Sequence, residues 1–382
     1  MTPRPIIVAI PARDEADRIG ACLAALIVQR DRVGCPLPAG SFEVLVLANG
    51  CRDGTAAEVR RWAATSPHPI RCIEETLASG SANAGGARRR AMDLAAERLA
   101  GCDGLILTTD ADSTVAITWV AETLAAFKPG IAAVAGYIDA HPAEIVRLGA
   151  AFLQRGRLED RYLSLVAEIE ARCDPRPHDP WPNHRVSSGA SLAVTAAAYN
   201  QVGGLPALPV GEDAAFTALL DRAGLSVRHA MTVVVSTSCR LDGRAPGGAA
   251  DTMRDRHAQP EAPCDAGLER ARPTLRRAAL RGRFRVGWED GEGLWHLAER
   301  LGLPEPELAA LAHRAAREPF ATVWDWVEAR SPVLRRAGLL RPSDLHGEIA
   351  AATRLLGRLR SPSRPLAARG VRQAPAALLI DA

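Results

Sequence analysis

Short apolar runs alternate with segments of helical periodicity through the first part of this chain. Residues 5–10, 42–48, 70–74 and 105–109 are rich in Val, Ile and Leu, and each run predicts a buried strand. Between them, apolar residues recur every three or four positions, as on one face of a helix. Strands that alternate with helices in this way predict an α/β fold with a mostly parallel, doubly wound sheet.

Further along the chain three more strands are predicted, and then the pattern changes. These strands cover residues 131–137, 187–194 and 226–237. From residue 249 the chain contains prolines, arginines and helical periodicity without a strand pattern. We therefore predict an α/β domain at residues 1–248, a mostly helical C-terminal region at 249–370, and a loose tail at 371–382.

Two helices have predicted starts that depend on polar residues. Asp14 and Glu15 precede an apolar stripe, which predicts a helix that begins at these two acids. The Ser-Thr pair at positions 113 and 114 precedes apolar-periodic residues 115–127, which predicts a helix that begins at residue 115.

Composition is that of an ordinary globular protein. The 382 residues are 47% hydrophobic and 24% charged, which excludes a disordered chain and is enough for more than one core. The formal net charge is only +3, and Lys128 is the only lysine. Because no basic run interleaves with aromatic residues in the α/β part, we predict no nucleic-acid partner.

The cysteines and the apolar runs bear on where in the cell the protein is located. The eight cysteines are scattered without a C-x-x-C pair, so we expect reduced thiols. No signal peptide is recognisable, and no apolar run approaches the roughly 20 residues that span a bilayer, so we predict no transmembrane segment. We expect a cytoplasmic protein, and contact with the inner membrane surface stays open.

The acidic pair in Asp110-Ala111-Asp112 directly follows the strand predicted at residues 105–109. Ligands of open α/β sheets bind beyond the carboxyl ends of the strands, and carboxylate oxygens there suit Mg²⁺ or Mn²⁺ carrying a diphosphate. The alternative is a solvated turn or a helix cap. Both interpretations stay open on this pattern alone.

Three other polar stretches are candidates for binding or catalysis. Small residues at 80–86 precede the helix that carries Arg88, where backbone amides could approach a phosphate or simply form a tight turn. Glu212 and Asp213 open another helix, either as dipole-favoured acids or with one carboxylate as a general base. The Gly/Arg loop at 238–248 could fold over the site or link two domains.

Five short motifs occur in a fixed order over roughly residues 5–248. They are Ile10-Pro11-Ala12-Arg13-Asp14-Glu15, Ala48-Asn49-Gly50-Cys51-Arg52-Asp53-Gly54-Thr55, Asn83-Ala84-Gly85-Gly86-Ala87-Arg88, Asp110-Ala111-Asp112 and Gly211-Glu212-Asp213. This ordered set resembles the family 2 glycosyltransferases, which use nucleotide-sugar donors. The resemblance implies the GT-A fold, a nucleoside-diphosphate sugar as donor, and an enzyme that transfers a hexose.

The resemblance further implies which residues bind the donor. Those that would contact the nucleotide and its phosphates are Pro11, Ala12, Arg13, Glu15, Asn49, Asn83 and Arg88. Asp110 would contact the ribose or the metal, with Ala111 beside it. Asp112 would bind the Mg²⁺ or Mn²⁺ ion that bridges the diphosphate.

Catalytic roles are implied in the same way. Asp213 would deprotonate the acceptor hydroxyl, and Glu212 would support it. A base on the face opposite the leaving diphosphate gives direct displacement with inversion, so a β-linkage would form from an α-linked donor. A cation and arginines beside the diphosphate would stabilise the charge that develops on it.

Several departures from the family limit these implications. Ala48-Asn49-Gly50-Cys51 stands where members often have Asp-Asp-Gly-Ser, so an amide replaces a carboxylate that usually contacts the base. The Gln-x-x-Arg-Trp motif of processive members is absent, which favours the transfer of a single sugar. The frequent histidine after the last strand is also missing.

Alternative functions remain. A retaining GT-A transferase acting on a small hydroxy acid would share Asp110 and Asp112 but would not need Asp213 as a base. A nucleotidyltransferase usually has a glycine-rich loop after the first strand, and Pro11-Ala12-Arg13-Asp14-Glu15 contains no glycine. A non-catalytic scaffold that binds nucleotide sugars is a further alternative. The acceptor is not predicted.

Overall fold

The computed structural model describes residues 4–243, 245–290 and 294–361, so the tail predicted at 371–382 lies outside the described residues. Its contacts divide the chain into two units, and each is described by itself. Unit 1 comprises Met1–Gly149 and His184–Ala258, and unit 2 comprises Ala150–Asn183 and Gln259–Ala382. The domain boundary at residue 248 stays a prediction, while the packing groups residues 150–183 with the C-terminal helices.

Unit 1 is built on an eight-stranded sheet with the strand order β3-β2-β1-β4-β7-β6-β8-β5. The strands are β1 (Ile6–Ala12), β2 (Glu43–Asn49), β3 (Ile70–Glu75), β4 (Leu105–Thr108), β5 (Thr114–Val115), β6 (Ile131–Ala140), β7 (Leu192–Thr195) and β8 (Ser226–Thr237). The four strands from β3 to β4 are parallel, as are β6 and β8, whereas β7 is antiparallel to both of its neighbours. The predicted α/β fold is confirmed.

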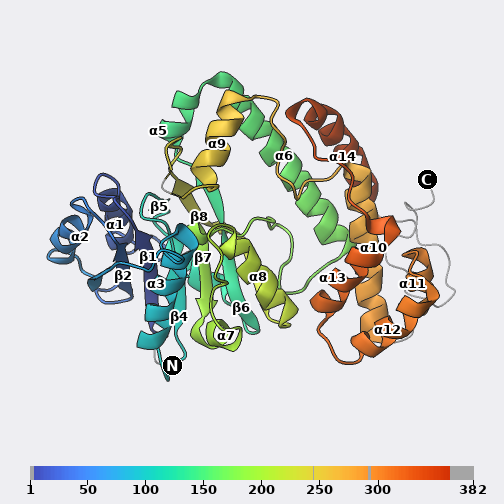
Figure 1. Cartoon of the computed structure of the whole chain (residues 1–382), viewed down its shortest axis with the longest axis horizontal. Coiled ribbons are helices and arrows are strands. Elements are labelled where there is room, and N and C mark those ends of the chain that lie inside the picture. The colour runs from blue at the N-terminus through green and yellow to red at the C-terminus, as the bar shows by residue number, and fades with distance from the viewer. Residues whose placement is uncertain (1–3, 244, 291–293, 362–382) are drawn as a thin grey trace. The chain divides into compact units, whose positions relative to one another are not determined.

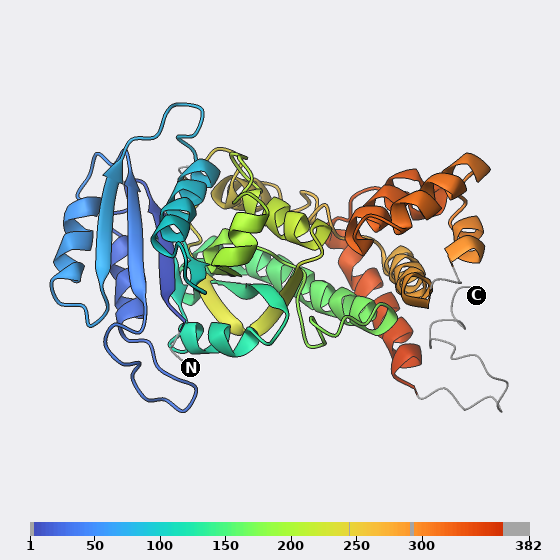
Figure 2. The same ribbon diagram turned by 90° about the horizontal axis from the view of Figure 1, so that it is seen from below.

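Helices cover both faces of this sheet (Figures 1 and 2). One face packs against α1 (Ile19–Ile27), α2 (Thr55–Ala63) and α4 (Trp119–Ala126), and the other against α3 (Ala84–Arg98), α7 (Ala196–Gln201) and α8 (Glu212–Arg222). In β1 the side chains of Ile6 and Val8 join the first core and those of Ile7 and Ala9 join the second. A strand that is apolar on both faces is what a sheet covered on both sides requires.

Three element starts differ from the prediction. The first helix begins at Ile19 and not at Asp14, because Asp14 has a left-handed φ of 52° and a turn follows it. Residue 115 belongs to β5, which pairs with β8, so the following helix begins at Trp119. A short 3₁₀ turn occupies Gly189–Ser191, so the strand predicted from residue 187 begins at Leu192.

Unit 2 is helical, as predicted for the C-terminal region. The helices α6 (Ala150–Cys173), α10 (Ala271–Asp290) and α14 (Leu345–Arg360) enclose one apolar core. A second core lies between α10 and the helices α11 (Leu294–Arg300), α12 (Glu305–Ala315) and α13 (Phe320–Arg330). Within the described part of the chain, no helix combines the length and apolarity needed to cross a bilayer.

Candidate active site

One cavity of about 340 Å³ lies at the carboxyl ends of the strands of unit 1. Its walls come from the loops after β1, β2, β4 and β8 and from the starts of α3 and α8. Ligands bind at this edge of open α/β sheets. The sequence-predicted site residues that line it are Pro11, Ala12, Arg13, Glu15, Asn49, Asn83, Arg88, Asp110, Ala111, Asp112, Glu212 and Asp213. The structure therefore brings all of them to one place.

Arg88 links two of the predicted acids from inside the protein. Its side chain is only 8% exposed, and its Nη2 donates to Oδ1 of Asp110 at 2.6 Å while its Nε donates to Oε1 of Glu212 at 3.0 Å. Nη1 donates to the carbonyl of Gly189 and to Oγ1 of Thr108. A planar guanidinium can hold several acceptors in fixed directions, so α3, β4 and α8 are connected at this point.

The positive charge of the buried Arg88 is balanced by the carboxylates that it contacts. Burial alone would lower the pKa of Arg88, but the charges of Asp110 and Glu212 outweigh that effect and raise it. The arginine is therefore a permanent cation in the wall of the cavity. Glu212 is itself 5% exposed and directs its carboxylate to this cation.

Asp213 has a different environment from its neighbour Glu212. It is the second residue of α8, which begins directly after Gly211, whose φ of 78° is left-handed. Its Oδ2 accepts from the backbone N–H of Gly189 at 2.8 Å, and its Oδ1 accepts from that of Ala214. Asp213 is partly exposed and lines the cavity. Of the two adjacent acids, it is therefore the one that a bound molecule can reach.

Asp112 and Glu15 share a second arginine. Arg240, from the loop after β8, donates to both carboxylate oxygens of Glu15 at 2.7 and 2.9 Å, and its Nη2 lies 3.0 Å from Oδ2 of Asp112. Burial and the charge of Asp110 raise the pKa of Asp112 to about 6, and Arg240 opposes this rise. Among the described residues, five acids and three arginines line the cavity, so it gathers more negative charge than its arginines neutralise.

The two asparagines of the cavity have different hydrogen bonds. Asn83 caps α3: its Oδ1 accepts from Gly86 N–H at 2.8 Å, and its Nδ2 donates to the carbonyl of Gly80. Asn49, at the end of β2, is 3% exposed, and its Oδ1 accepts from Leu77 N–H at 3.1 Å. Asn83 is therefore engaged at both ends of its amide, whereas the described residues engage only the oxygen of Asn49.

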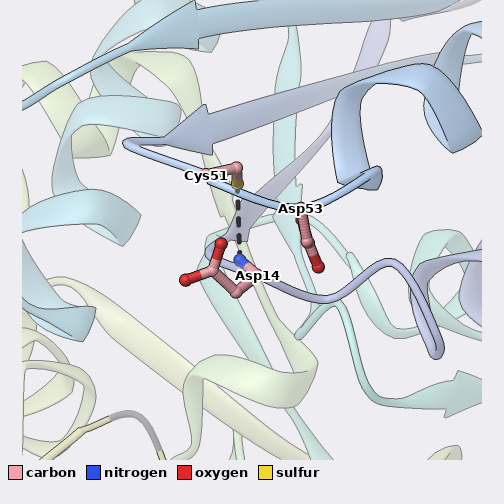
Figure 3. A group of neighbouring side chains, drawn as sticks. All are labelled: Asp14, Cys51 and Asp53. Atoms are coloured by element: carbon pink, nitrogen blue, oxygen red, sulfur yellow. Dashed lines mark hydrogen bonds between the residues drawn. The ribbon is translucent and has the colours of Figure 1, made fainter.

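A group of three possible metal ligands lies in the loops after β1 and β2 (Figure 3). The ligand atoms of Asp14, Cys51 and Asp53 lie within 4.8 Å of one another. The carboxylates already accept from backbone N–H groups, Asp14 from Arg52 at 2.7 Å and Asp53 from Ala16 at 3.0 Å. Burial raises the pKa of the Cys51 thiol, which favours its protonated form. These contacts hold the loop after β1 against the loop after β2.

Sequence reasoning did not identify Arg240 as an individual site residue. The Gly/Arg loop was predicted either to cover the site or to link domains, and nothing in its sequence distinguished Arg240 from its other arginine. The loop continues into α9 (Ala249–Ala258), and the cavity is lined there by Ala249, Ala250 and Met253. The small apolar positions at the start of α9 were the only local signal for this wall.

Comparisons with known proteins agree with this architecture. Residues 7–168 match the family model described as Glycosyl transferase family 2. No curated protein sequence matches the chain.

Solved structures give more distant likenesses. The mannosyltransferase PcManGT from Pyrobaculum calidifontis, in complex with GDP-Man and Mn²⁺, is 22% identical over 87% of this chain and 86% of its own, with a TM-score of 0.43. TarS 1-349 from S. aureus in complex with UDP-GlcNAc is 15% identical over 86% of this chain and 90% of its own, with a TM-score of 0.45. At these scores the two likenesses add no argument about the site.

Proposed function

This chain carries a glycosyltransferase family 2 domain, and we propose that it transfers one sugar from a nucleoside-diphosphate sugar to an acceptor hydroxyl, with inversion. The observation that carries the proposal is the convergence of Asp110, Asp112 and Asp213 on one cavity. The first two stand after β4 and the third opens α8. A donor between them would have its diphosphate and its anomeric carbon near different carboxylates.

The acids after β4 fit a divalent cation, because they are hard oxygen donors in a cavity whose acids outnumber its arginines. Asp112 is the better candidate of the two. Its partner Arg240 comes from a loop, whereas Arg88, the partner of Asp110, comes from the helix α3. Asp110 can contribute its second carboxylate oxygen, because Arg88 occupies the first. When bound, Mg²⁺ or Mn²⁺ would supply positive charge for the leaving diphosphate.

Asp213 is proposed to take the proton of the acceptor hydroxyl. Two backbone N–H groups fix its orientation, and lone pairs remain on both oxygens for a hydroxyl that enters the cavity. As the acceptor oxygen attacks the anomeric carbon, its proton passes to Asp213 and the bond to the diphosphate breaks. Attack from the side opposite the leaving group inverts the configuration of the sugar.

Arg88 and Glu212 are proposed to position these groups. Arg88 is buried and holds Asp110, Glu212 and the carbonyl of Gly189, while the N–H of Gly189 holds Asp213. Both carboxylate sites are therefore connected through the same backbone segment. This arrangement favours a positioning role for Arg88 over a direct contact with the donor.

Arg240 is proposed to bind the phosphate oxygens of the donor's diphosphate. In the structure its guanidinium neutralises Glu15 and Asp112 in the same cavity. Once a cation takes Asp112, one face of the guanidinium would be available for phosphate oxygens, which it can bind in the same forked manner as a carboxylate. Arg240 would therefore bind Asp112 first and the phosphate oxygens afterwards.

Product analysis with an Asp213→Asn variant tests the proposal. We expect kcat to fall by about a hundredfold to ten-thousandfold, as for the loss of a general base, with donor binding retained. Asp17→Asn, at an exposed acid outside the cavity, is the matched control. Anomeric analysis of the wild-type product should give inversion. Retention of configuration together with an active Asp213→Asn variant would contradict the role of Asp213 as the general base of an inverting transfer.

A cytosolic location is proposed from the cysteines. All eight are free thiols in the structure, and four of them are buried. Persistent free thiols are usual in reducing compartments. Cell fractionation with detection of the native chain tests this, and recovery in an oxidising compartment with disulfides would contradict it.

A further inference from the structure

Glu144 is a charged residue that the proposed chemistry does not use. It belongs to α5 (Pro142–Ile145), a short helix after β6, and its side chain is 24% exposed. Its Oε2 accepts from the backbone N–H of Cys239 at 2.8 Å and from Oγ of Ser238 at 3.1 Å. Its Oε1 accepts from Nη1 of Arg18 at 2.8 Å. One carboxylate therefore joins the segment before α1 to the loop after β8.

The hydroxyl of Ser238 extends this connection to Arg240. It donates its single proton to Glu144. Its two lone pairs accept from Nη1 of Arg18 at 2.9 Å and from the backbone N–H of Arg240 at 3.2 Å. Because the donor and both acceptor positions of this hydroxyl are engaged, its orientation is fixed. Residues 238–240 are thereby tied to Arg18 and Glu144.

The side chain of Arg240 closes a ring of hydrogen bonds at Glu15. Its guanidinium donates to both carboxylate oxygens of Glu15, and the backbone carbonyl of Glu15 accepts from the N–H of Arg18 at 3.0 Å. Arg240 is thus held at its backbone through Ser238 and at its guanidinium through Glu15. Both connections lead to the same turn, residues 15–18. The backbone of Arg240 therefore stays held by Ser238 if its guanidinium changes partner.

The charge of Glu144 strengthens its hold on the loop. Burial alone would raise the pKa of Glu144, but the N–H of Cys239 and the guanidinium of Arg18 outweigh that effect and lower it. Hydrogen bonds to an ionised carboxylate are stronger than those between neutral groups. Ser238 and Arg240 line the cavity, whereas Glu144 and Arg18 are not among the described residues of its wall. The contacts of Glu144 therefore reach a bound donor through Ser238 and Arg240.

We propose that Glu144 is a positioning residue, which holds the backbone of Arg240 so that the guanidinium can bind the phosphate oxygens of the donor. The inference rests on the proposed function, in which this guanidinium leaves Asp112 for the diphosphate. Because residues 238–240 are already held, the exchange requires a rotation of the Arg240 side chain and no rearrangement of the backbone there. A group that is ordered before its ligand arrives loses less conformational freedom on binding, which raises the affinity.

A double-mutant cycle between Glu144 and Arg240 tests the inference. Calorimetry of the full chain with saturating Mn²⁺ identifies which of UDP, GDP, dTDP and CDP binds most tightly, and that nucleotide is used for every variant. Glu144→Gln should weaken its binding about fivefold to tenfold, because charged hydrogen bonds that hold the loop are lost. Arg240→Gln should weaken it at least as much. Adding Glu144→Gln to Arg240→Gln should cause no further loss.

Glu122→Gln is the matched control. Glu122 is an acid of α4 that pairs with Arg32 at 3.0 Å, and its side chain is 16% exposed. It is not among the described residues that line the cavity. The control should leave the nucleotide affinity unchanged in the wild-type and the Arg240→Gln backgrounds. Circular dichroism of each variant verifies that it is folded.

A second variant serves if Glu144→Gln fails to fold. Arg18→Gln removes the donor that Glu144 and Ser238 share, and its effect should depend on Arg240 in the same way. Equal losses of affinity in both backgrounds, or no loss in the wild-type background, would overturn the positioning role while the donor site stands. An Arg240→Gln variant that binds the nucleotide as tightly as the wild type would overturn it too. If no nucleotide binds the wild type with Mn²⁺, the proposed function itself is overturned, and this inference with it.

Discussion

Two arginines neutralise two aspartates that are separated by a single residue, and they do so in different ways. Arg88 comes from α3, is 8% exposed, and donates to side chains and backbone of three other segments. Arg240 comes from the loop after β8, is 19% exposed, and bonds only to the carboxylates of Glu15 and Asp112 among its side-chain contacts in the described chain.

The difference separates a fixed part of the site from an exchangeable part. Replacing Arg88 would leave Glu212 and one oxygen of Asp110 buried without a counter-charge, so its position is enforced by the core. Arg240 holds groups that are also suited to a cation, and its loop can exchange one partner for another. A site that must admit a charged donor needs both kinds of arginine.

The largest effect should come from Arg88→Met. Removing one member of a buried ionic network typically costs about 3–5 kcal/mol, so we expect a loss of that size in the free energy of unfolding. Urea denaturation followed by circular dichroism measures it. Arg240→Met is the comparison and should cost less than Arg88→Met, because the Arg240 side chain is 19% exposed against 8% for Arg88. Equal losses of unfolding free energy in the two variants would contradict the distinction between the two arginines.

Gly189→Ala should perturb the packing around Arg88 without removing a charged group. A methyl group there would lie 2.2 Å from the Arg88 guanidinium, which cannot move without breaking its other bonds. Overpacking of this kind costs about 1–3 kcal/mol, to be measured by the same denaturation. Gly156→Ala in α6 meets no atom within 4 Å and should be neutral or slightly stabilising. An unperturbed Gly189→Ala protein would mean that this contact is loose.

The smallest effect should come from Arg240→Gln, measured as Mn²⁺ affinity of the nucleotide-free protein by electron paramagnetic resonance. Removing the cation that shares Asp112 should tighten Mn²⁺ binding by about tenfold, since one nearby charge contributes on the order of 1 kcal/mol. Arg98→Gln, which removes the exposed partner of Glu43, is the control and should change nothing. Weaker Mn²⁺ binding in Arg240→Gln would show that Arg240 supports the cation instead of competing with it.

Much of the fold could be predicted because its signals are local. The apolar runs of β1, β2 and β4 each lie in consecutive residues of the sequence. The failures have long-range causes. Thr114 and Val115 form β5 only because β8 supplies partners more than a hundred residues away. Asp14 adopts a left-handed backbone because its own N–H donates to Cys51 Sγ and its carboxylate accepts from Arg52 N–H, both in the loop after β2.

Site membership was more predictable than site roles. Every motif residue to which the resemblance assigned a donor-binding, metal-binding or catalytic role lines the cavity, because strand ends and helix starts recur at fixed places in the fold. The difference between Arg88 and the exposed Arg89 was not predictable, since three consecutive arginines look alike until a core surrounds one of them. The link from Arg240 to Glu15 spans most of the domain and has no local sign.

The measurement that tests the account most directly is Mn²⁺ binding in the presence of a nucleoside diphosphate, compared between Asp112→Asn and Asp14→Asn. Asp14→Asn removes a carboxylate from the neighbouring acidic group, and asparagine tolerates the left-handed backbone there. We predict that nucleotide-dependent Mn²⁺ binding is lost in Asp112→Asn and kept in Asp14→Asn. Binding that survives in Asp112→Asn but disappears in Asp14→Asn would contradict the assignment of the cation to the acids after β4.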